Sequence, residues 1–349
     1  MAGQAEGRHV RLRSLDALRG IAAMAVVIFH MTVGFDQDVY FPGEDPSLFD
    51  FSLGRYGVAL FFVLSGFVIL WSLRRVETVG QFAGGRFSRL YPPYWASLLF
   101  VSAYILIAGN FFVMPEEMQF DAVQFLANLT MVPQWFGQKA IDEAYWTLAV
   151  EMGFYLLVGF LFWVGLTKKE RIVKTLVVLY VVSLLVGIAN GLAGSGAANN
   201  FLYYFVAGMA LFVYIDEPDK DKWIKLALVF GAPLVPLAQG TVTPAVISLG
   251  IVIVMFLAVT GRLGFLESRP LLWLGSISYP LYLVHAYPGY ITMKLLLDAG
   301  VGRDLAIAAA ILQAVVLAII VHKTIEKPIT RWLRVRWGLG RPKSQVAAG

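Results

Sequence analysis

The sequence of 349 residues contains no cysteine, and both charged residues and histidines are scarce. Without cysteine there are no disulfide bonds, no thiolate nucleophile and no cysteine-based metal site. Charged residues make up 15% of the chain, whereas a typical soluble domain carries about 25%. Hydrophobic residues make up 58%, so much of the surface must face something other than water. The composition therefore indicates a membrane protein.

Long apolar runs divide the chain into segments that can cross a bilayer, for which a helix needs about 20 residues. They predict an all-α polytopic membrane protein with about ten transmembrane helices. The expected spans are residues 15–34, 55–73, 94–113, 146–166, 172–189, 200–215, 224–238, 242–260, 272–292 and 303–325. We expect residues 1–340 to form one transmembrane domain, followed by a polar tail at 341–349.

Basic and acidic clusters alternate between the expected spans. The two tails and residues 74–89 and 168–174 are basic, whereas residues 36–50 and 116–143 are mainly acidic. Because basic loops remain in the cytoplasm, this alternation predicts that both termini are cytoplasmic. The net charge of +5 follows from these clusters. No nucleic-acid motif accompanies the basic residues, so we expect membrane lipid and not nucleic acid as a partner.

Arg19 and His30 lie in the first apolar run, with ten residues between them. On a helix this spacing places both side chains on one face, about 16 Å apart along the axis. Such side chains are costly inside a membrane, so the pair indicates a polar pathway there. A hydrogen bond from His30 to a neighbouring helix is the structural alternative.

Glu151 is a carboxylate inside the fourth expected span, shortly after Trp146. Tryptophan is typical of membrane interfaces, which places Glu151 about 8 Å below the outer surface. His30 is expected at a similar depth. We therefore predict that Glu151 orients His30, which acts as a general base. The alternative is a buried ion pair that braces two helices.

Arg86 and Arg89 are one helical turn apart on the expected cytoplasmic side. Two guanidinium groups at this spacing form a fork suited to phosphate, although positive-inside anchoring explains such a pair as well. Together with Arg19 they predict a cytoplasmic anion site. Pro92 and Pro93, which follow, predict the start of the third helix.

Several further polar residues lie in apolar stretches. Ser65 follows small residues that favour close helix packing, which explains it better than a nucleophilic role. Pro280 predicts a broken helix that carries Tyr279, Tyr282 and His285. These hydroxyls and the imidazole are candidates for an acceptor cleft, and a kink with satisfied polar groups is the alternative.

The segment between the third and fourth expected spans contains apolar residues at helical spacing. Residues 120–129 therefore predict an amphipathic helix on the outer surface. The chain contains no His-Glu-x-x-His motif or other metal-ligand spacing. We accordingly expect no metal cofactor.

Together these motifs resemble acyltransferase family 3, a family of membrane O-acyltransferases. The spacing of Arg19 and His30, combined with the Arg-x-x-Arg pair, is the specific part of the resemblance. Further matching segments are residues 15–22, 57–67, 146–155, 278–285 and 325–328. One departure is Met152, where family members often have a second acid after the glutamate.

The resemblance implies transfer of an acyl group, commonly acetyl from acetyl-CoA, to a hydroxyl of a glycan or another acceptor. His30 and Glu151 would be catalytic. The implied donor-binding residues are Arg19, Arg86 and Arg89, and the candidate substrate-binding residues are Ser65, Trp146, Tyr279, Tyr282 and His285. The pantetheine arm of acyl-CoA, held at its phosphates by the arginines, matches the spacing from Arg19 to His30.

The expected acceptor is a cell-surface saccharide or its lipid-linked precursor, reached from a bacterial inner membrane. A small apolar metabolite such as a macrolide is an alternative acceptor. A membrane glycosyltransferase that uses a polyprenyl-phosphate sugar is a rival function, with Asp36 and Asp38 as its acids. A proton-coupled transporter is the second rival. The sequence leaves a homo-oligomer open.

Overall fold

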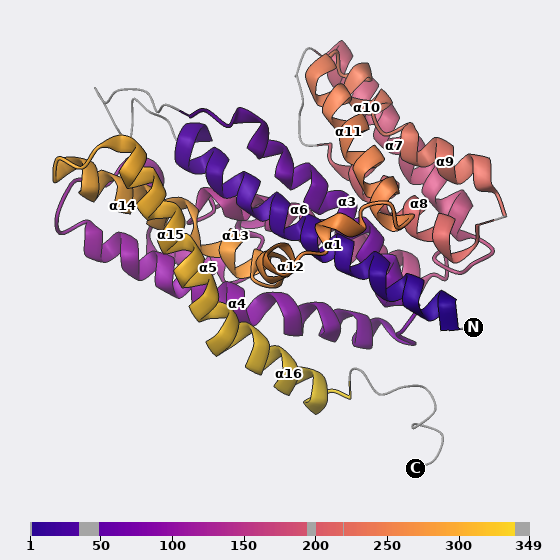
Figure 1. Cartoon of the computed structure of the whole chain (residues 1–349), viewed down its shortest axis with the longest axis horizontal. Coiled ribbons are helices and arrows are strands. Elements are labelled where there is room, and N and C mark those ends of the chain that lie inside the picture. The colour runs from indigo at the N-terminus through magenta and orange to yellow at the C-terminus, as the bar shows by residue number, and fades with distance from the viewer. Residues whose placement is uncertain (1, 35–48, 194–199, 219, 339–349) are drawn as a thin grey trace. The chain divides into compact units, whose positions relative to one another are not determined.

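The computed structural model describes residues 2–34, 49–193, 200–218 and 220–338. These residues form helices and connecting turns, and no β-strand occurs among them (Figure 1). The prediction of an all-α polytopic membrane protein is confirmed. The acids Asp36 and Asp38 and the polar tail 341–349 lie outside the described residues.

Seven described segments are long and apolar enough to cross a membrane. They are Arg13–Gly34, Ser52–Leu73, Val79–Ala108, Glu143–Trp163, Ile172–Leu192, Val242–Val259 and Arg303–Arg336. Helix α8 (Leu202–Asp216) is apolar but shorter. The number of ten spans and the cytoplasmic position of both termini stay predictions.

Two expected spans are interrupted in the structure. The segment predicted at 224–238 forms α9 (Lys222–Phe230) and α10 (Leu234–Ala238). The segment predicted at 272–292 forms three helices in succession, which are α12 (Arg269–Ser276), α13 (Ser278–Val284) and α14 (Ala286–Asp298). The break predicted near Pro280 is confirmed, because Pro280 lies in the first turn of α13.

The chain divides into two compact units, each built from three segments. The first unit comprises Met1–Ala22, Tyr56–Val76 and Gly153–Ser276, and the second comprises Ala23–Arg55, Glu77–Met152 and Ile277–Gly349. Two of the boundaries fall inside helices, one in α1 (Ala2–Phe29) and one in α6 (Trp146–Trp163). That residues 1–340 act as one domain stays a prediction.

In the first unit, α3 (Gly57–Leu73) and α8 approach each other through two glycines. A Cβ added at Gly208 would lie 1.9 Å from the Val63 carbonyl oxygen. A Cβ added at Gly66 would lie 2.1 Å from the carbonyl oxygen of Phe205. Small residues at these positions allow the two backbones to touch, as in many membrane helix pairs.

Glycines also close two other helix contacts of the first unit. Helix α10 lies beside both α7 (Ile172–Leu192) and α11 (Val242–Val259) (Figure 1). A Cβ at Gly191 of α7 would lie 2.3 Å from a carbonyl oxygen of α10. A Cβ at Gly20 of α1 would lie 2.6 Å from the backbone nitrogen of Gly275 in α12. The glycine of the Leu-Arg-Gly sequence in the first helix therefore serves close packing.

In the second unit, α4 (Val79–Ala108) continues through Pro92 and Pro93. The prediction that these prolines begin the third helix was wrong. Pro92 has no N–H to donate to the carbonyl group of Ser88, and Pro93 has none to donate to that of Arg89. The Thr330 hydroxyl of α16 (Lys327–Arg336) donates to the Ser88 oxygen at 2.9 Å. This contact from a second helix replaces the hydrogen bond that Pro92 cannot make within α4.

The segment between α4 and α6 packs back along α4. Three aromatic side chains of α4 donate to consecutive backbone carbonyl groups at the end of α5 (Ala122–Asn128). The Tyr94 hydroxyl donates to the Asn128 oxygen at 2.7 Å, and the Trp95 indole donates to the Leu129 oxygen at 2.9 Å. These contacts lie about 20 Å before the end of α4. The predicted surface helix at 120–129 is therefore shorter than expected, and its end packs against the middle of α4.

The remaining helices complete the two units. In the second unit, α15 (Arg303–Val321) leads through the π-helix η7 (His322–Glu326) into α16, and Figure 1 shows all three as one long yellow helix. The short 3-10 helices outside the site are η2 (Ser52–Tyr56), η3 (Glu116–Met118), η4 (Pro133–Phe136) and η6 (Gly264–Leu266).

Candidate active site

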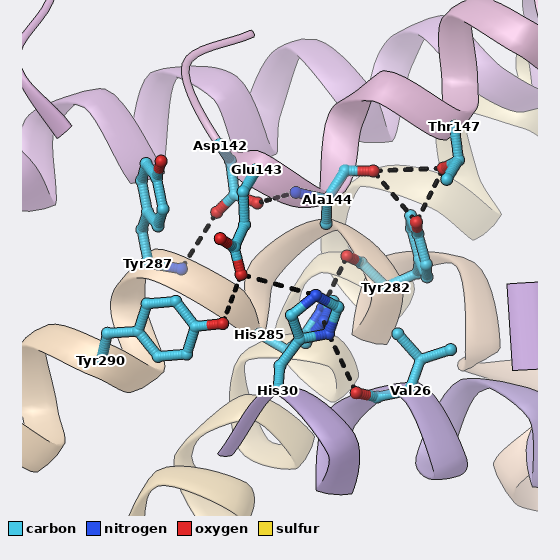
Figure 2. Close-up of polar contacts among 10 residues, drawn as sticks. All are labelled: Val26, His30, Asp142, Glu143, Ala144, Thr147, Tyr282, His285, Tyr287 and Tyr290. Carbon is cyan, nitrogen blue, oxygen red and sulfur yellow. Dashed lines mark hydrogen bonds and ion pairs between the residues drawn. The ribbon is translucent and has the colours of Figure 1, made fainter. Parts of the chain in front are cut away.

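His30 lies where the first long helix changes its hydrogen-bond pattern. Helix α1 ends at Phe29, and His30 begins the π-helix η1 (His30–Gly34). Short π-helical turns occur frequently at functional sites. The side chain of His30 is 14% exposed, and its Nδ1 lies 2.9 Å from the Val26 carbonyl oxygen (Figure 2).

His285 lies at the break between α13 and α14 and is completely buried. Pro288, in the first turn of α14, has no N–H to donate to the preceding turn, which explains the break. His285 Nδ1 lies 2.8 Å from the Tyr282 carbonyl oxygen. Its Nε2 lies 3.1 Å from His30 Nδ1, so the structure brings both intramembrane histidines together.

Glu143 is the carboxylate that the structure places at His30. It begins the 3-10 helix η5 (Glu143–Tyr145), and its Oε1 lies 3.4 Å from His30 Nε2 (Figure 2). The Tyr290 hydroxyl of α14 donates a hydrogen bond to the same oxygen. Sequence reasoning missed Glu143 because it was counted among the acidic loop residues. Its position three residues before the tryptophan of the family motif was the available signal.

Asp142 links η5, the 3-10 helix that begins with Glu143, to α14 through hydrogen bonds. Its carboxylate accepts hydrogen bonds from the backbone N–H groups of Ala144 at 2.9 Å and Tyr287 at 3.1 Å. Burial of the side chain raises the pKa of Asp142 to about 6, against the lowering effect of these two hydrogen bonds. Asp142 thus connects the residue next to Glu143 with a residue two positions after His285.

Two tyrosines that were predicted to bind substrate have structural partners. The Tyr282 hydroxyl donates to the Ala144 carbonyl oxygen at 3.0 Å and lies 2.7 Å from the Thr147 hydroxyl. The Tyr279 hydroxyl donates to the Leu90 carbonyl oxygen of α4 at 2.9 Å. These bonds hold α13 against η5 and α4, and a role in binding the acceptor stays a prediction for both tyrosines.

The other predicted substrate and catalytic residues are placed as follows. Glu151 lies in α6, eight residues after Glu143, and its pairing with His30 stays a prediction. Trp146 is the first residue of α6 and is 39% exposed, which suits an interfacial anchor. Ser65 belongs to the first unit, where its hydroxyl lies 3.2 Å from that of Tyr155.

The three predicted donor-binding arginines are divided between the units. Arg19 belongs to the first unit, and its guanidinium lies 3.5 Å from the Asp16 carboxylate. Arg86 and Arg89 belong to the second unit and flank Ser88, where α4 contacts α16. Their convergence on one anion, and a polar pathway from Arg19 to His30, stay predictions.

The cluster of two imidazoles and a carboxylate is suited to proton transfer. Each of the three side chains comes from a different part of the second unit. His30 and His285 lie where one helix ends and another begins, and Glu143 is the first residue of η5. Among the residues that the structure describes, no group of three or more His, Asp or Glu side chains is arranged to hold a metal ion.

Comparison with known proteins assigns the chain to a family. A family model described as "Acyltransferase domain" matches residues 12–323. The exopolysaccharide production protein ExoZ of Rhizobium meliloti is 25% identical over 82% of this chain and 92% of its own length. The O-acetyltransferase OatA of Staphylococcus aureus is 24% identical over 92% of this chain and 57% of its own length.

The acyltransferase MdmB of Streptomyces mycarofaciens is 31% identical over 46% of this chain. The match thus spans 41% of MdmB and 57% of OatA, and both relatives are longer than this chain. No solved structure matches the chain. Because the family model covers most of the sequence, from the first helix into η7, the chain belongs to acyltransferase family 3, a family of acyl-transferring enzymes.

Proposed function

We propose that this protein is a membrane O-acyltransferase that moves an acyl group, most simply acetyl, from cytoplasmic acyl-CoA to a hydroxyl group. His30 is the general base that removes the proton of the acceptor hydroxyl. The observation that carries this proposal is the contact of His30 with a second imidazole and a carboxylate, within the sequence matched by the acyltransferase family. The family supplies the reaction class, and the cluster supplies a group able to accept a proton.

Arg86 and Arg89 are proposed to bind the phosphates of the acyl-CoA donor. They lie one helical turn apart on α4, and guanidinium groups bind phosphate with paired hydrogen bonds. Arg19 is proposed as a third donor-binding residue, at the family position that precedes the histidine. Glu151 is retained as a second catalytic residue on the basis of the family motif alone.

The proposed acceptor is a saccharide of the cell surface or its lipid-linked precursor. The support comes from ExoZ, which is named for exopolysaccharide production and matches across nearly its full length. The long apolar helices place the protein in a membrane, and we propose the bacterial inner membrane. There the donor is present on one side and surface saccharides pass through or along the bilayer.

Purified protein in lipid bilayers tests the proposal with radiolabelled acetyl-CoA and a saccharide acceptor. We expect His30→Ala to lose at least about 100-fold in the rate of transfer, because general-base catalysis contributes about 100- to 10,000-fold. The matched control is His322→Gln, since His322 pairs with Glu326 outside the site. Near-normal activity of His30→Ala would refute the assignment of the base.

The same assay distinguishes acyl transfer from the two alternative functions, which are glycosyl transfer and proton-coupled transport. A glycosyltransferase would use a polyprenyl-phosphate sugar and leave the thioester of acetyl-CoA intact. A transporter would need two compartments, whereas an acyltransferase cleaves the thioester in detergent solution when the acceptor is present. Acceptor-dependent release of free CoA thiol in detergent is therefore the expected result.

A further inference from the structure

We propose that His285 and Glu143 are positioning residues that prepare His30 for its reaction. His285 holds His30 in one tautomer, and Glu143 stabilises the positive charge that His30 acquires. It follows that Nε2 of His30 is the nitrogen that takes the proton of the acceptor. This inference rests on the proposed function for its chemistry, but its structural part is tested independently of activity.

The backbone around the two histidines determines where their protons lie. A neutral imidazole carries one N–H, and a carbonyl oxygen only accepts hydrogen bonds. His30 Nδ1 lies 2.9 Å from the Val26 oxygen, and His285 Nδ1 lies 2.8 Å from the Tyr282 oxygen. A bare nitrogen at either position would place its lone pair against an oxygen lone pair. Both rings therefore carry their proton on Nδ1.

The contact between the two rings agrees with this assignment. With its own proton on Nδ1, neutral His285 presents a bare Nε2, which lies 3.1 Å from His30 Nδ1. The N–H of His30 is then shared between this nitrogen and the Val26 oxygen. Because His285 is completely buried, water does not compete for its Nε2. His285 thus orients His30 as a hydrogen-bond acceptor, as a carboxylate orients the histidine of a catalytic triad.

Glu143 faces the other nitrogen of His30. Its Oε1 lies 3.4 Å from His30 Nε2, farther than the two acceptors lie from Nδ1, so the shorter contacts of Nδ1 decide where the proton of neutral His30 lies. The Tyr290 hydroxyl donates to the same carboxylate oxygen and fixes the carboxylate (Figure 2). A carboxylate at this distance attracts an imidazolium more strongly than a neutral imidazole. The interaction therefore strengthens as the reaction proceeds, which is the requirement for lowering its barrier.

The resulting step is balanced without a further reactant. His30 Nε2 takes the proton of the acceptor hydroxyl while the hydroxyl oxygen attacks the carbonyl carbon of the thioester. The carbon–sulfur bond breaks, and the sulfur leaves with the electron pair. The imidazolium returns its proton to the sulfur, which leaves an ester, a free thiol and neutral His30.

Nitrogen-15 solid-state NMR of histidine-labelled protein in lipid bilayers tests the tautomers in the absence of any acyl donor. The four histidines are distinguished by single His→Gln variants. We expect a proton on Nδ1 of both His30 and His285, and a bare Nε2 on His285. A proton on Nε2 of His285 would overturn the inference. This spectrum reports protonation directly, so it stands even if the proposed transfer reaction is absent.

Kinetics of two His285 variants test its role as an acceptor. His285→Gln retains an acceptor oxygen near the position of Nε2, whereas His285→Leu does not. We expect His285→Leu to lower kcat about 100-fold with little change in the KM for acetyl-CoA. We expect the kcat of His285→Gln to be at least about tenfold higher than that of His285→Leu. Equal loss in both variants, or a change confined to KM, would contradict the positioning role.

The kcat values of two Glu143 variants test whether the charge of this side chain contributes to the reaction. Glu143→Gln keeps the size of the side chain and removes its charge, and we expect kcat to fall about 100-fold. Glu143→Asp retains the charge, and we expect an intermediate rate. The control is Glu116→Gln, an exposed acid of the same loop. Wild-type kcat in Glu143→Gln would exclude a charge effect on His30.

Discussion

The two units of the chain differ in the contacts that hold their helices together. The first unit packs apolar helices through glycines, so that backbones touch at Gly66 and Gly208 and at Gly20 and Gly275. Both units contain interrupted helices, and in the second unit histidines lie at the interruptions, as at His30 and His285. Close packing of backbones makes a helix pair rigid. Polar groups at a helix break instead form hydrogen bonds with other segments of the chain.

This difference teaches where chemistry can be placed within a membrane protein. Irregular backbone at membrane depth is tolerated only where protein or a polar cavity satisfies its hydrogen bonds. In the second unit, side chains supply these bonds: Thr330 to the Ser88 oxygen, and Trp95 to that of Leu129. Substitutions in the first unit should therefore affect folding, and substitutions near the breaks should affect transfer.

The largest effect should come from filling a glycine contact of the first unit. In Gly208→Leu the side chain would collide with the Val63 carbonyl group, and overpacking costs about 1–3 kcal/mol, occasionally more. We expect a large loss of folded protein, measured by size-exclusion chromatography and thermal unfolding in detergent. Gly250→Leu is the matched control, since a Cβ at Gly250 has no neighbour within 4 Å. Equal yields of the two variants would show that close glycine contacts do not hold the first unit together.

Asp142 should show a smaller effect on stability and a clear effect on transfer. Asp142→Asn turns an amide N–H₂ toward one of two backbone donors, which costs about 1–3 kcal/mol. Since the Glu143 turn then shifts, we expect kcat to fall about tenfold or more. Asp121→Asn is the control, because asparagine also caps α5. Unchanged kcat in Asp142→Asn would separate this aspartate from the site.

Arg86 should affect the donor and not the acceptor. Loss of a charged hydrogen bond to phosphate costs about 1.5–3 kcal/mol, so in Arg86→Ala the KM for acetyl-CoA should rise about tenfold or more. The KM for the saccharide should stay within about twofold if phosphate binding alone is lost. Lys174→Ala removes another basic residue of an expected cytoplasmic cluster and is the control. A rise in the acceptor KM alone would move Arg86 out of the donor site.

The smallest effect should come from the helix contact that compensates the prolines of α4. Thr330→Val keeps the shape of the side chain and leaves the Ser88 oxygen without its donor, at a cost of about 1 kcal/mol. We expect a small decrease in the midpoint of thermal unfolding and little change in kcat. Thr324→Val is the control, because its hydroxyl donates within its own helix at Ile320.

Sequence reasoning was most reliable where one helix face carried the signal. His30 was found as a titratable residue in an apolar run, and His285 was found together with the break at Pro280. Glu143 was missed because it lies in a polar segment, where a glutamate carries no unusual cost. The continuation of α4 through Pro92 was also missed, since it depends on a hydroxyl from α16.

The amino-acid sequence by itself determined the class of protein and the reaction family, and it made His30 a candidate for the site. These follow from composition, apolar length and motif spacing, which are local properties of the chain. Only the tertiary structure decided which groups surround that histidine, because residues 143 and 285 are far from it in sequence. Hydrogen bonds depend on distance in space, and the folding of the broken helices brings these three side chains within reach of one another.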